Sequence, residues 1–284
     1  MKHFVFSLMI AALTTMSCQA QFEREYFNIP YLENGSEANK LDLFLPAEGN
    51  GSFPVVVFIH GGGWFRGDKQ DGQEVPWKKL LQYGYAVASV NYTLAGDAPH
   101  PAGIEDCKAA VRFLREHARD YHIKPNRMAV SGGSSGAHYA LMVTVSGDVP
   151  VTCCVAWYGG LDLPLIIADA MNPEWDNFGA QFAIDNCSRY LGHKIDSPDD
   201  PALELASPIH YISAEMPPVL LQHGTNDQLA PHNQSVRFYE KAVTIVPEGR
   251  VEIDLLEGLS HADARFGTDE NMARVAEFLD KYMK

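Results

Sequence analysis

The chain has 284 residues, and its 36 Asp and Glu outnumber its 22 Lys and Arg, which gives a formal net charge of −14. Such a surplus of negative charge argues against nucleic acid or an anionic membrane surface as a partner, although it says little about a neutral ligand. The length suits one α/β domain rather than two.

The first 20 residues are predicted to be a signal peptide. A basic start precedes an apolar run over residues 4–13 that is too short to span a bilayer. Cleavage after Ala20 satisfies the small-residue rule and leaves Gln21 as the new N-terminus. The alternative is a lipoprotein acylated at Cys18, and only in that case is a membrane an expected partner. Either route implies export, to the periplasm or to the extracellular medium.

Strand and helix patterns alternate along the rest of the chain. Strands are predicted near residues 23–28, 40–45, 54–60, 85–92, 127–131, 151–158, 219–223 and 250–257. Helices are predicted near residues 77–83, 103–121, 135–146, 233–246 and 269–283. This alternation favours an α/β class, with a mostly parallel central sheet flanked by helices in a single domain over residues 21–284.

The third predicted strand ends in a run of glycines. Its apolar and mostly β-branched residues 55–59 are typical of a buried parallel strand, and residues 60–64 continue as His-Gly-Gly-Gly-Trp. Glycines here let backbone N–H groups turn toward a developing negative charge, as acyl-transfer enzymes require. We expect His60 to hold this loop. Trp64 is a candidate for substrate binding, with buttressing of the loop as the alternative.

A second motif follows the strand over residues 127–131. Residues 132–136 form the G-x-S-x-G pattern of a nucleophile elbow, with Ser134 at its centre. Small residues two before and two after the serine permit a strained turn between a strand and a helix. The helix that follows directs its first N–H groups at the site, so the amide of Ser135 can join an oxyanion hole.

The least regular part of the chain lies between Tyr158 and Met216, and we expect a cap-like insertion at about residues 159–216. Its aromatic rings could stack on a sugar or an aryl acyl group, or they could pack against the domain itself. These aromatic residues are Trp175, Phe178, Phe182 and Tyr190.

A serine nucleophile needs a histidine base and a carboxylate that orients the base. The apolar strand over residues 219–223 runs into a turn that carries Asp227. The alternating strand over residues 250–257 precedes a loop that carries His261. The expected order of the reacting residues is therefore Ser134, Asp227 and His261.

We expect neither a metal nor a cofactor. Cys107, Cys153, Cys154 and Cys187 match no zinc-site spacing, and buried thiols are the expected state. The acidic run over residues 196–200 is more typical of a solvated loop than of a calcium site.

Together these motifs resemble the α/β-hydrolase superfamily. The likeness is to the esterase branch with an H-G-G-G-W loop, which includes hormone-sensitive-lipase-like esterases and bacterial feruloyl or acetyl esterases. The matching segments are residues 60–64, 132–136, 223–227 and 260–261. The resemblance covers nearly the whole chain after the leader, and it implies the α/β-hydrolase fold.

The resemblance also implies roles for single residues. Ser134 is the expected nucleophile, Asp227 the acid and His261 the base. Backbone amides of the oxyanion hole are expected from three residues, which are Gly62, Gly63 and Ser135.

The main functional hypothesis is an exported serine carboxylesterase that hydrolyses acetyl or hydroxycinnamoyl esters of carbohydrates through an acyl-enzyme. An arylformamidase or a general small-ester hydrolase is the enzymatic alternative, because the same loop occurs there. A catalytically silent glycan-binding surface protein is the non-enzymatic alternative, although an intact serine, aspartate and histidine set argues against it. The expected partner is thus a small-molecule or glycan ester.

Overall fold

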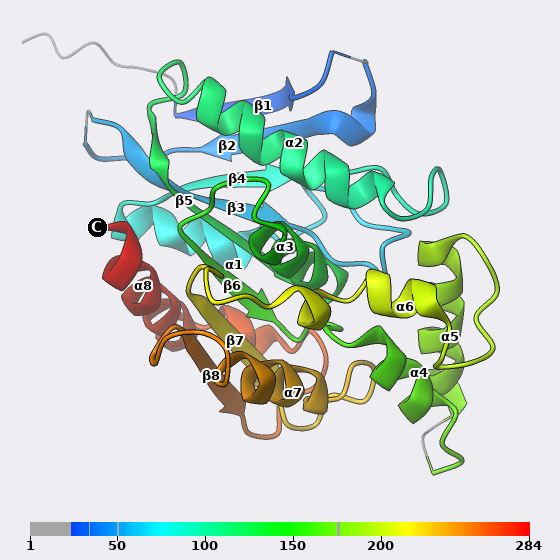
Figure 1. Cartoon of the computed structure of the whole chain (residues 1–284). Coiled ribbons are helices and arrows are strands. Elements are labelled where there is room, and N and C mark those ends of the chain that lie inside the picture. The colour runs from blue at the N-terminus through cyan, green and yellow to red at the C-terminus, as the bar shows by residue number, and fades with distance from the viewer. Residues whose placement is uncertain (1–23, 34, 50, 175–176) are drawn as a thin grey trace, which may run out of the picture.

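The computed structural model describes residues 24–33, 35–49, 51–174 and 177–284. The predicted signal peptide, with Cys18, and the predicted new terminus at Gln21 lie outside the described residues, as does Trp175. Within the described part, eight strands form one sheet in the order β1-β2-β4-β3-β5-β6-β7-β8 (Figure 1). This is the α/β-hydrolase architecture that the sequence predicts.

The strands lie close to their predicted positions. They are β1 (Glu25–Pro30), β2 (Lys40–Phe44), β3 (Phe53–Ile59), β4 (Ala86–Val90), β5 (Ile123–Gly133), β6 (Cys153–Trp157), β7 (Val219–Gly224) and β8 (Val251–Leu256). β2 pairs antiparallel with both β1 and β4, and every later pairing is parallel. The parallel strands therefore end at one edge of the sheet, where the sequence motifs follow them.

Helices cover both faces of the sheet. The α-helices are α1 (Val75–Lys78), α2 (Ala102–Glu116), α3 (Ser135–Ser146), α4 (Leu163–Ala170), α5 (Asn177–Leu191), α6 (Pro201–Leu205), α7 (Asn233–Ala242) and α8 (Asp269–Met283). The 3-10 turns are η1 (Glu37–Asn39), η2 (Lys79–Tyr83), η3 (Pro208–Tyr211) and η4 (Ala264–Gly267). None of the helices in the described ranges combines the length and the apolar character that a membrane span needs.

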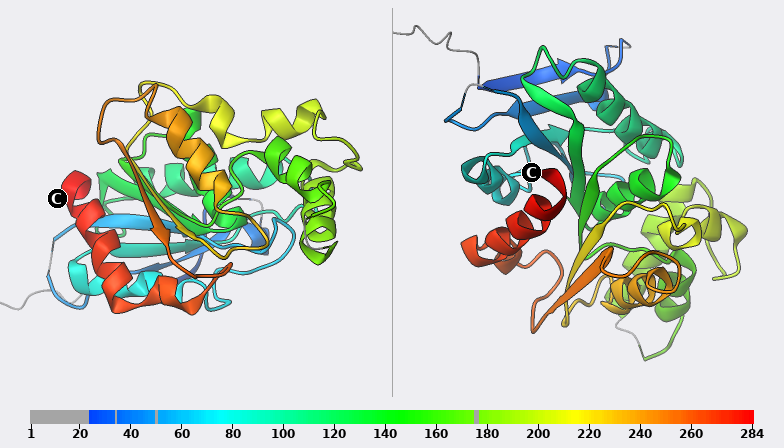
Figure 2. Two further views of the ribbon diagram at one scale, coloured as in Figure 1. Left: turned by 90° about the horizontal axis from the view of Figure 1, so that it is seen from below. Right: turned by 60° about the vertical axis from the view of Figure 1, so that its left-hand side comes forward.

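The hydrophobic core has two parts, one on each side of the sheet. Alternate residues of β3 enter different parts: Val55 and Val57 pack with α2, α3 and α7, whereas Val56 and Phe58 pack with α1, η2 and α8. Figure 2 shows these two helix layers on opposite faces of the strands. Both faces of β3 are thus buried, which explains its unbroken apolar sequence.

The region between β6 and β7 corrects one expectation. It was expected to be the least regular part of the chain, but it contains α4, α5 and α6, which contact one another at one end of the molecule (Figure 1). Apolar residues lie on most sides of α4, so its sequence shows little of the alternation between apolar and polar residues that indicates a helix. α5 contains Gly179, Asn186 and Cys187, whose helix propensity is low. Mutual packing, rather than local sequence, therefore forms these helices.

Candidate active site

Ser134 lies at the sharp turn between β5 and α3, with φ 56° and ψ −125°. Residues with a side chain rarely adopt a positive φ, so this backbone is strained. A Cβ on Gly132 would lie 2.4 Å from the carbonyl carbon of Gly136. A Cβ on Gly136 would lie 2.1 Å from the carbonyl oxygen of Ile59. Only glycine at these two positions lets α3 approach β3 and β5 so closely.

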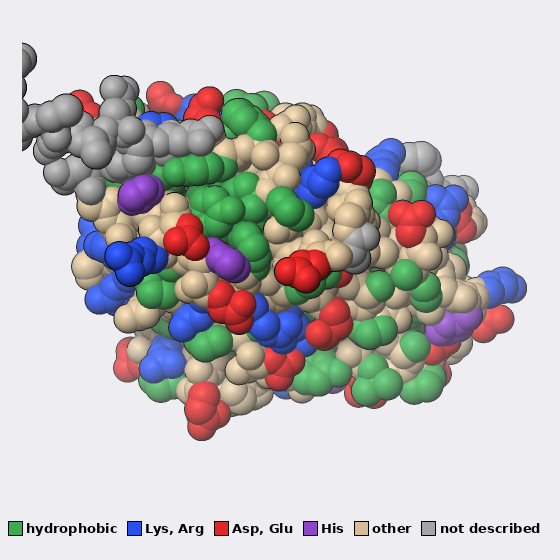
Figure 3. Space-filling view, turned by 90° about the horizontal axis from the view of Figure 1, so that it is seen from above, with side chains coloured by type: hydrophobic (Ala, Val, Ile, Leu, Met, Phe, Trp, Pro, Cys, Tyr) green, Lys and Arg blue, Asp and Glu red, His purple; other side chains and the backbone are tan. Residues whose placement is uncertain are grey.

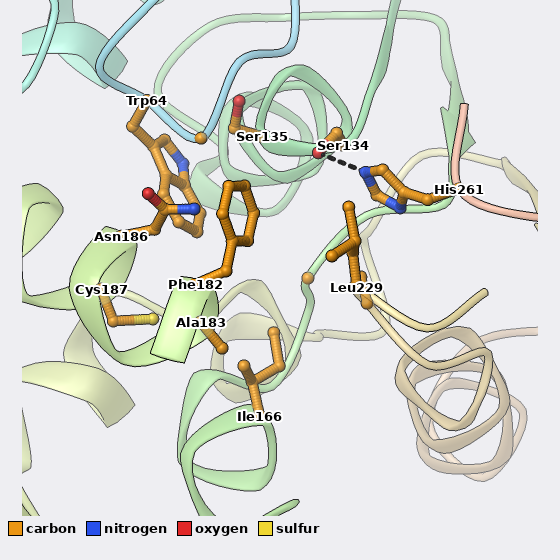
Figure 4. A pocket seen from close by; sticks show the side chains of 13 residues that line it. Trp64, Ser134, Ser135, Ile166, Phe182, Ala183, Asn186, Cys187, Leu229 and His261 are labelled. Carbon is orange, nitrogen blue, oxygen red and sulfur yellow. Dashed lines mark hydrogen bonds between the residues drawn. The ribbon is translucent and has the colours of Figure 1, made fainter. Parts of the chain in front are cut away.

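The structure brings Ser134, His261 and Asp227 into one hydrogen-bonded chain. His261 Nε2 lies 2.9 Å from Ser134 Oγ, as the dashed line in Figure 4 marks. His261 Nδ1 lies 2.7 Å from Asp227 Oδ2. The serine comes from the elbow after β5, the aspartate from the turn after β7 and the histidine from the loop after β8. This geometry lets the imidazole take a proton from the serine while the carboxylate holds the ring.

The surroundings of Asp227 keep its carboxylate charged. The side chain is buried, and burial alone would raise its pKa. Hydrogen bonds from His223 and His261, the charge of His261 and the N–H of Ala230 together hold the pKa of Asp227 well below its usual range. A second N–H, from Leu229, also donates to Oδ1 at 2.9 Å. The acid is therefore ionised at neutral pH.

The glycine run after β3 forms a loop beside Ser134. Gly62 and Gly63 have φ values of 122° and 63°, which favour glycine. The N–H of Gly61 donates to Gln73 Oε1 at 2.8 Å, whereas the amides of Gly62 and Gly63 donate to no acceptor in the described part of the chain. Two backbone donors at this loop are thus available to a ligand. The expected oxyanion roles of Gly62, Gly63 and Ser135 stay predictions.

Gln73 and Asp71 brace this loop, and the sequence did not indicate either residue. Gln73 Nε2 donates to Asp71 Oδ2 at 2.8 Å while its Oε1 accepts from Gly61. His60 lies on the other side, where its Nδ1 is 2.8 Å from the carbonyl oxygen of Gly61 and its ring stacks on Tyr92. Both side chains hold Gly61, so His60 has the structural place expected for it.

A small, mostly apolar pocket opens beside Ser134, with a volume of about 40 Å³. Figure 4 shows Trp64 and Asn186 on one side of it and Leu229 and His261 on the other. The lining residues are Gly63, Trp64, Ser134, Ser135, Gly160, Ile166, Phe182, Ala183, Asn186, Cys187, Leu229, Ala230 and His261. The sequence singled out Trp64 and Phe182 in this lining but missed Asn186, because nothing local marks an asparagine in a helix as a pocket residue.

Trp64 is held in place by aromatic contacts. Its ring stacks on Tyr190 with centroids 4.5 Å apart and meets the edge of His138 at 5.2 Å. His138 Nδ1 lies 2.8 Å from the carbonyl oxygen of Gly160, and burial lowers the pKa of His138 to about 3. Tyr190 therefore lies behind Trp64 and is absent from the pocket lining, so it supports Trp64.

A wider and more polar cleft of about 360 Å³ lies along the glycine loop. It shares Ser134, Phe182 and His261 with the small pocket, and Arg66, Asp71 and Gln73 add polar groups. A neighbouring cleft of about 350 Å³ continues past Asp71, Gln73 and Ala262. The nucleophile thus has a narrow apolar space and a broad polar space next to it.

The cysteines and His223 lie in the interior of the protein, where they have structural contacts. Cys107, Cys153, Cys154 and Cys187 are buried free thiols, as expected. His223 is buried, where its Nδ1 lies 2.8 Å from Ser235 Oγ. Across the described ranges, no three His, Cys, Asp or Glu side chains form a group that could hold a metal ion.

Known proteins resemble this chain over most of its length. Esterase LipQ of Mycobacterium tuberculosis is 31% identical over 227 residues, which cover 74% of this chain and 51% of LipQ. The probable isoprenylcysteine alpha-carbonyl methylesterase ICMEL1 of Arabidopsis thaliana is 28% identical over 255 residues, which cover 81% of this chain and 52% of that protein. The chain spans about half the length of these curated relatives.

Solved structures give the same picture. A truncated carbohydrate esterase from gut microbiota superposes with a TM-score of 0.78 at 24% identity, covering 92% of this chain and 96% of that one, which shows the shared fold. A bifunctional GH43-CE protein of Bacteroides eggerthii superposes with a TM-score of 0.76 at 28% identity, covering 90% of this chain and 35% of that one. A family model described as BD-FAE matches residues 41–242. That match runs from β2 to the end of α7, and the chain therefore belongs to the BD-FAE family of α/β-hydrolase esterases.

Proposed function

We propose that this protein is an exported serine carboxylesterase that removes short acyl groups, acetyl above all, from the hydroxyl groups of carbohydrates. The observation that carries the proposal is the position of the Ser134, His261 and Asp227 chain between a narrow apolar pocket and a broad polar cleft. An ester has an acyl part and an alcohol part, and these two spaces match them in size and polarity.

The proposed mechanism follows from the hydrogen bonds. His261 Nε2 takes the proton of Ser134 Oγ as the serine oxygen attacks the ester carbonyl carbon. The oxyanion accepts hydrogen bonds from the amides of Gly62, Gly63 and Ser135. Collapse releases the alcohol, which takes the proton from His261. Water then attacks the acyl-enzyme, with the same histidine as base, and frees the acid and the serine.

The narrow pocket favours a small acyl group. One water-sized atom needs about 10 to 15 Å³ of such space, so about 40 Å³ holds roughly three atoms, enough for the methyl group of an acetyl and a water molecule. A hydroxycinnamoyl group is several times larger, and it would need α5 to move away from Ser134. Acetyl is therefore the better candidate of the two acyl groups, and long alkyl chains fit worst.

Two arguments support a carbohydrate as the alcohol. The broad cleft carries Arg66 and Asp71, whose polar groups suit sugar hydroxyls. Two structural relatives are also described as a carbohydrate esterase and as a GH43-CE protein. An arylformamide or a plain small ester would use the same nucleophile but not the length of this cleft.

The test compares substrates and one variant. Purified protein should release acetate from acetylated xylan and cleave p-nitrophenyl acetate, with lower kcat/KM on methyl ferulate and on p-nitrophenyl esters of about eight carbons or more. Ser134→Ala should lower turnover by a factor on the order of 10⁴ or more while circular dichroism stays unchanged. Acetate release by Ser134→Ala at the wild-type rate would contradict the proposal, and activity on small esters alone would point to a general esterase.

Export is proposed from the sequence of the leader. Mass spectrometry of the protein from its native host should find either Gln21 at the N-terminus or an acylated Cys18. A mature protein that still begins at Met1 would contradict this part of the proposal without touching the chemistry.

A further inference from the structure

We propose that Asn186 selects the acyl group, because its side-chain amide supplies a hydrogen-bonding position inside the acyl pocket that longer alkyl chains cannot satisfy. This inference rests on the proposed esterase function. It makes Asn186 a specificity residue in the lining of the pocket rather than one of the reacting groups.

Asn186 is a buried polar residue without a protein partner. It lies on α5 with 5% of its surface exposed, and it lines the pocket beside Ser134. No residue in the described ranges forms a hydrogen bond with its side-chain amide. The amide does not belong to the described side-chain atoms that are both fully buried and unpaired, so it is open to the pocket that it lines, where water can bond to it. In Figure 4 the side chain reaches from α5 to the pocket wall next to Trp64.

The amide also lies against the glycine loop. Its Nδ2 would be 3.0 Å, and its Cγ 3.2 Å, from a Cβ placed on Gly63. It thus faces the part of the pocket next to the predicted oxyanion donors, close to where a bound carbonyl group would lie.

A second donor on the same wall has no partner either. The indole Nε1 of Trp64 is buried and forms no hydrogen bond with the described residues. Stacking on Tyr190 fixes the plane of this ring. Two N–H groups therefore share one wall of a pocket whose other walls are mostly apolar, formed by Ile166, Phe182, Ala183 and Leu229.

Longer apolar acyl groups should bind less favourably against this wall than small or polar ones. The carbonyl carbon of a bound acetyl group is bonded to Ser134 Oγ, so only its methyl group enters the pocket and a water molecule can still bond to Asn186. A propionyl or butyryl chain would displace that water and leave the amide buried without a partner, which is costly. A site built to form a hydrogen bond discriminates strongly against a ligand that cannot form it. A hydroxyl group in place of the terminal methyl of propionyl, as in a glycolyl group, would restore the bond.

The experiment measures kcat/KM of wild type and Asn186→Leu on p-nitrophenyl acetate, propionate and butyrate. Leucine is larger than asparagine but has no polar group. If the amide of Asn186 selects the acyl group, the ratio of kcat/KM on acetate to kcat/KM on butyrate should fall about tenfold in Asn186→Leu. If only size matters, the ratio should rise, because the pocket becomes smaller. An unchanged or increased ratio overturns the inference.

The matched control is Gln181→Leu. Gln181 lies on the same helix and is exposed, and its amide bonds to Asp185 instead of facing the pocket. This variant should keep the wild-type ratio, which separates acyl selection from a general loosening of α5.

A second measurement on wild type covers the case in which Asn186→Leu does not fold. Ethyl glycolate and ethyl propionate have the same number of heavy atoms, and their rates of hydroxide hydrolysis correct for intrinsic reactivity. After this correction, kcat/KM should be about tenfold higher for the glycolate than for the propionate. Equal corrected rates would overturn the inference. Absence of ester hydrolysis by wild type would instead contradict the proposed function itself.

Discussion

Two aspartates lie close to the proposed base, and only one of them contacts its ring. Asp227 is buried and accepts a hydrogen bond from His261 Nδ1, whereas the Asp263 carboxylate pairs with Arg265 at 2.7 Å. The carboxylate that orients the imidazole fixes its tautomer and stabilises its charged form. Asp227→Asn should therefore lower kcat/KM by a factor on the order of 10⁴. Asp263→Asn should leave it within about tenfold of wild type.

Steady-state rates on p-nitrophenyl acetate, with circular dichroism to verify folding, test this ranking. Asp263→Asn is the matched control, since it removes the same charge two residues from His261. A larger loss in Asp263→Asn than in Asp227→Asn would mean that the acid is misplaced.

At the residue scale, the functional residues that could be predicted are those that belong to a recognisable sequence motif. Ser134 has glycines at fixed spacing, and Asp227 and His261 each follow a strand whose pattern is readable. Gln73 and Asn186 have no such mark, because their contacts with Gly61 and Gly63 depend on how a loop folds back and where α5 docks. Contacts of that kind are set by tertiary structure, which a single sequence does not display.

The loop between β3 and α1 is anchored as a unit. Lys69 and Asp42 form a buried ion pair at 3.0 Å that ties the loop to β2. Gln73 then ties the same loop to Gly61. The orientation of the predicted oxyanion donors therefore depends on side chains that touch no substrate atom in the proposed mechanism.

Gln73→Leu should consequently lower kcat about tenfold with little change in KM, because loss of the Gly61 contact misaligns the donors that act on the transition state. Gln73→Glu keeps an acceptor for Gly61 and should recover part of the rate. Gln82→Leu, at an exposed glutamine of η2, is the control and should match wild type. A rise in KM alone would indicate that Gln73 serves substrate binding instead.

α5 closes the acyl pocket, and Phe182 is the largest of the side chains that this helix contributes to the pocket lining. The ring lines both the narrow pocket and the broad cleft, so it lies where the two meet. Figure 4 shows it among the residues of the narrow pocket. Phe182→Ala should enlarge the acyl space, so that kcat/KM for p-nitrophenyl butyrate rises about tenfold relative to acetate. The same variant should improve relative activity on methyl ferulate. A fixed chain-length preference would show that Phe182 does not limit the acyl group.

At the element scale, local pattern predicted the helices that pack on the sheet better than those of the insertion. α3 and α8 match their predicted ranges, since each has a clear start after a turn and an apolar stretch of the expected length. α2 ends at Glu116, earlier than predicted. α4, α5 and α6 were missed because they stabilise one another, and pairwise packing leaves little trace in the periodicity of each alone.

At the scale of the whole molecule, the sheet joins residues that are far apart in the chain. Ser134 and His261 are 127 positions apart, and they meet because β5 and β8 end at the same edge. The formal net charge of the chain is −14, and Figure 3 shows acidic and basic side chains intermixed over the face that it draws. The parallel sheet was predictable from the alternation of strands and helices, and a cap-like insertion was expected between β6 and β7, whereas its helices α4, α5 and α6 were not.

The fold also buries histidines, which ties its stability to pH. His60 and His138 are 1% and 0% exposed, and burial lowers the pKa of both, that of His138 to about 3. An unfolded histidine has a pKa of about 6.5. Below about pH 6.5 the unfolded chain therefore binds protons that the folded chain does not, so the free energy of unfolding falls as the pH falls.

Thermal unfolding midpoints should accordingly decline as the pH is lowered from about 7 to about 4, where the folded form keeps His138 neutral and the unfolded form does not. His138→Gln removes one of these groups, so its midpoint should be lower at pH 7 but should depend less steeply on pH. His117→Gln, at an exposed histidine of the C-terminal end of α2, is the control and should keep the wild-type slope. A His138→Gln slope equal to that of wild type would mean that this buried imidazole does not contribute to the acid sensitivity of the fold.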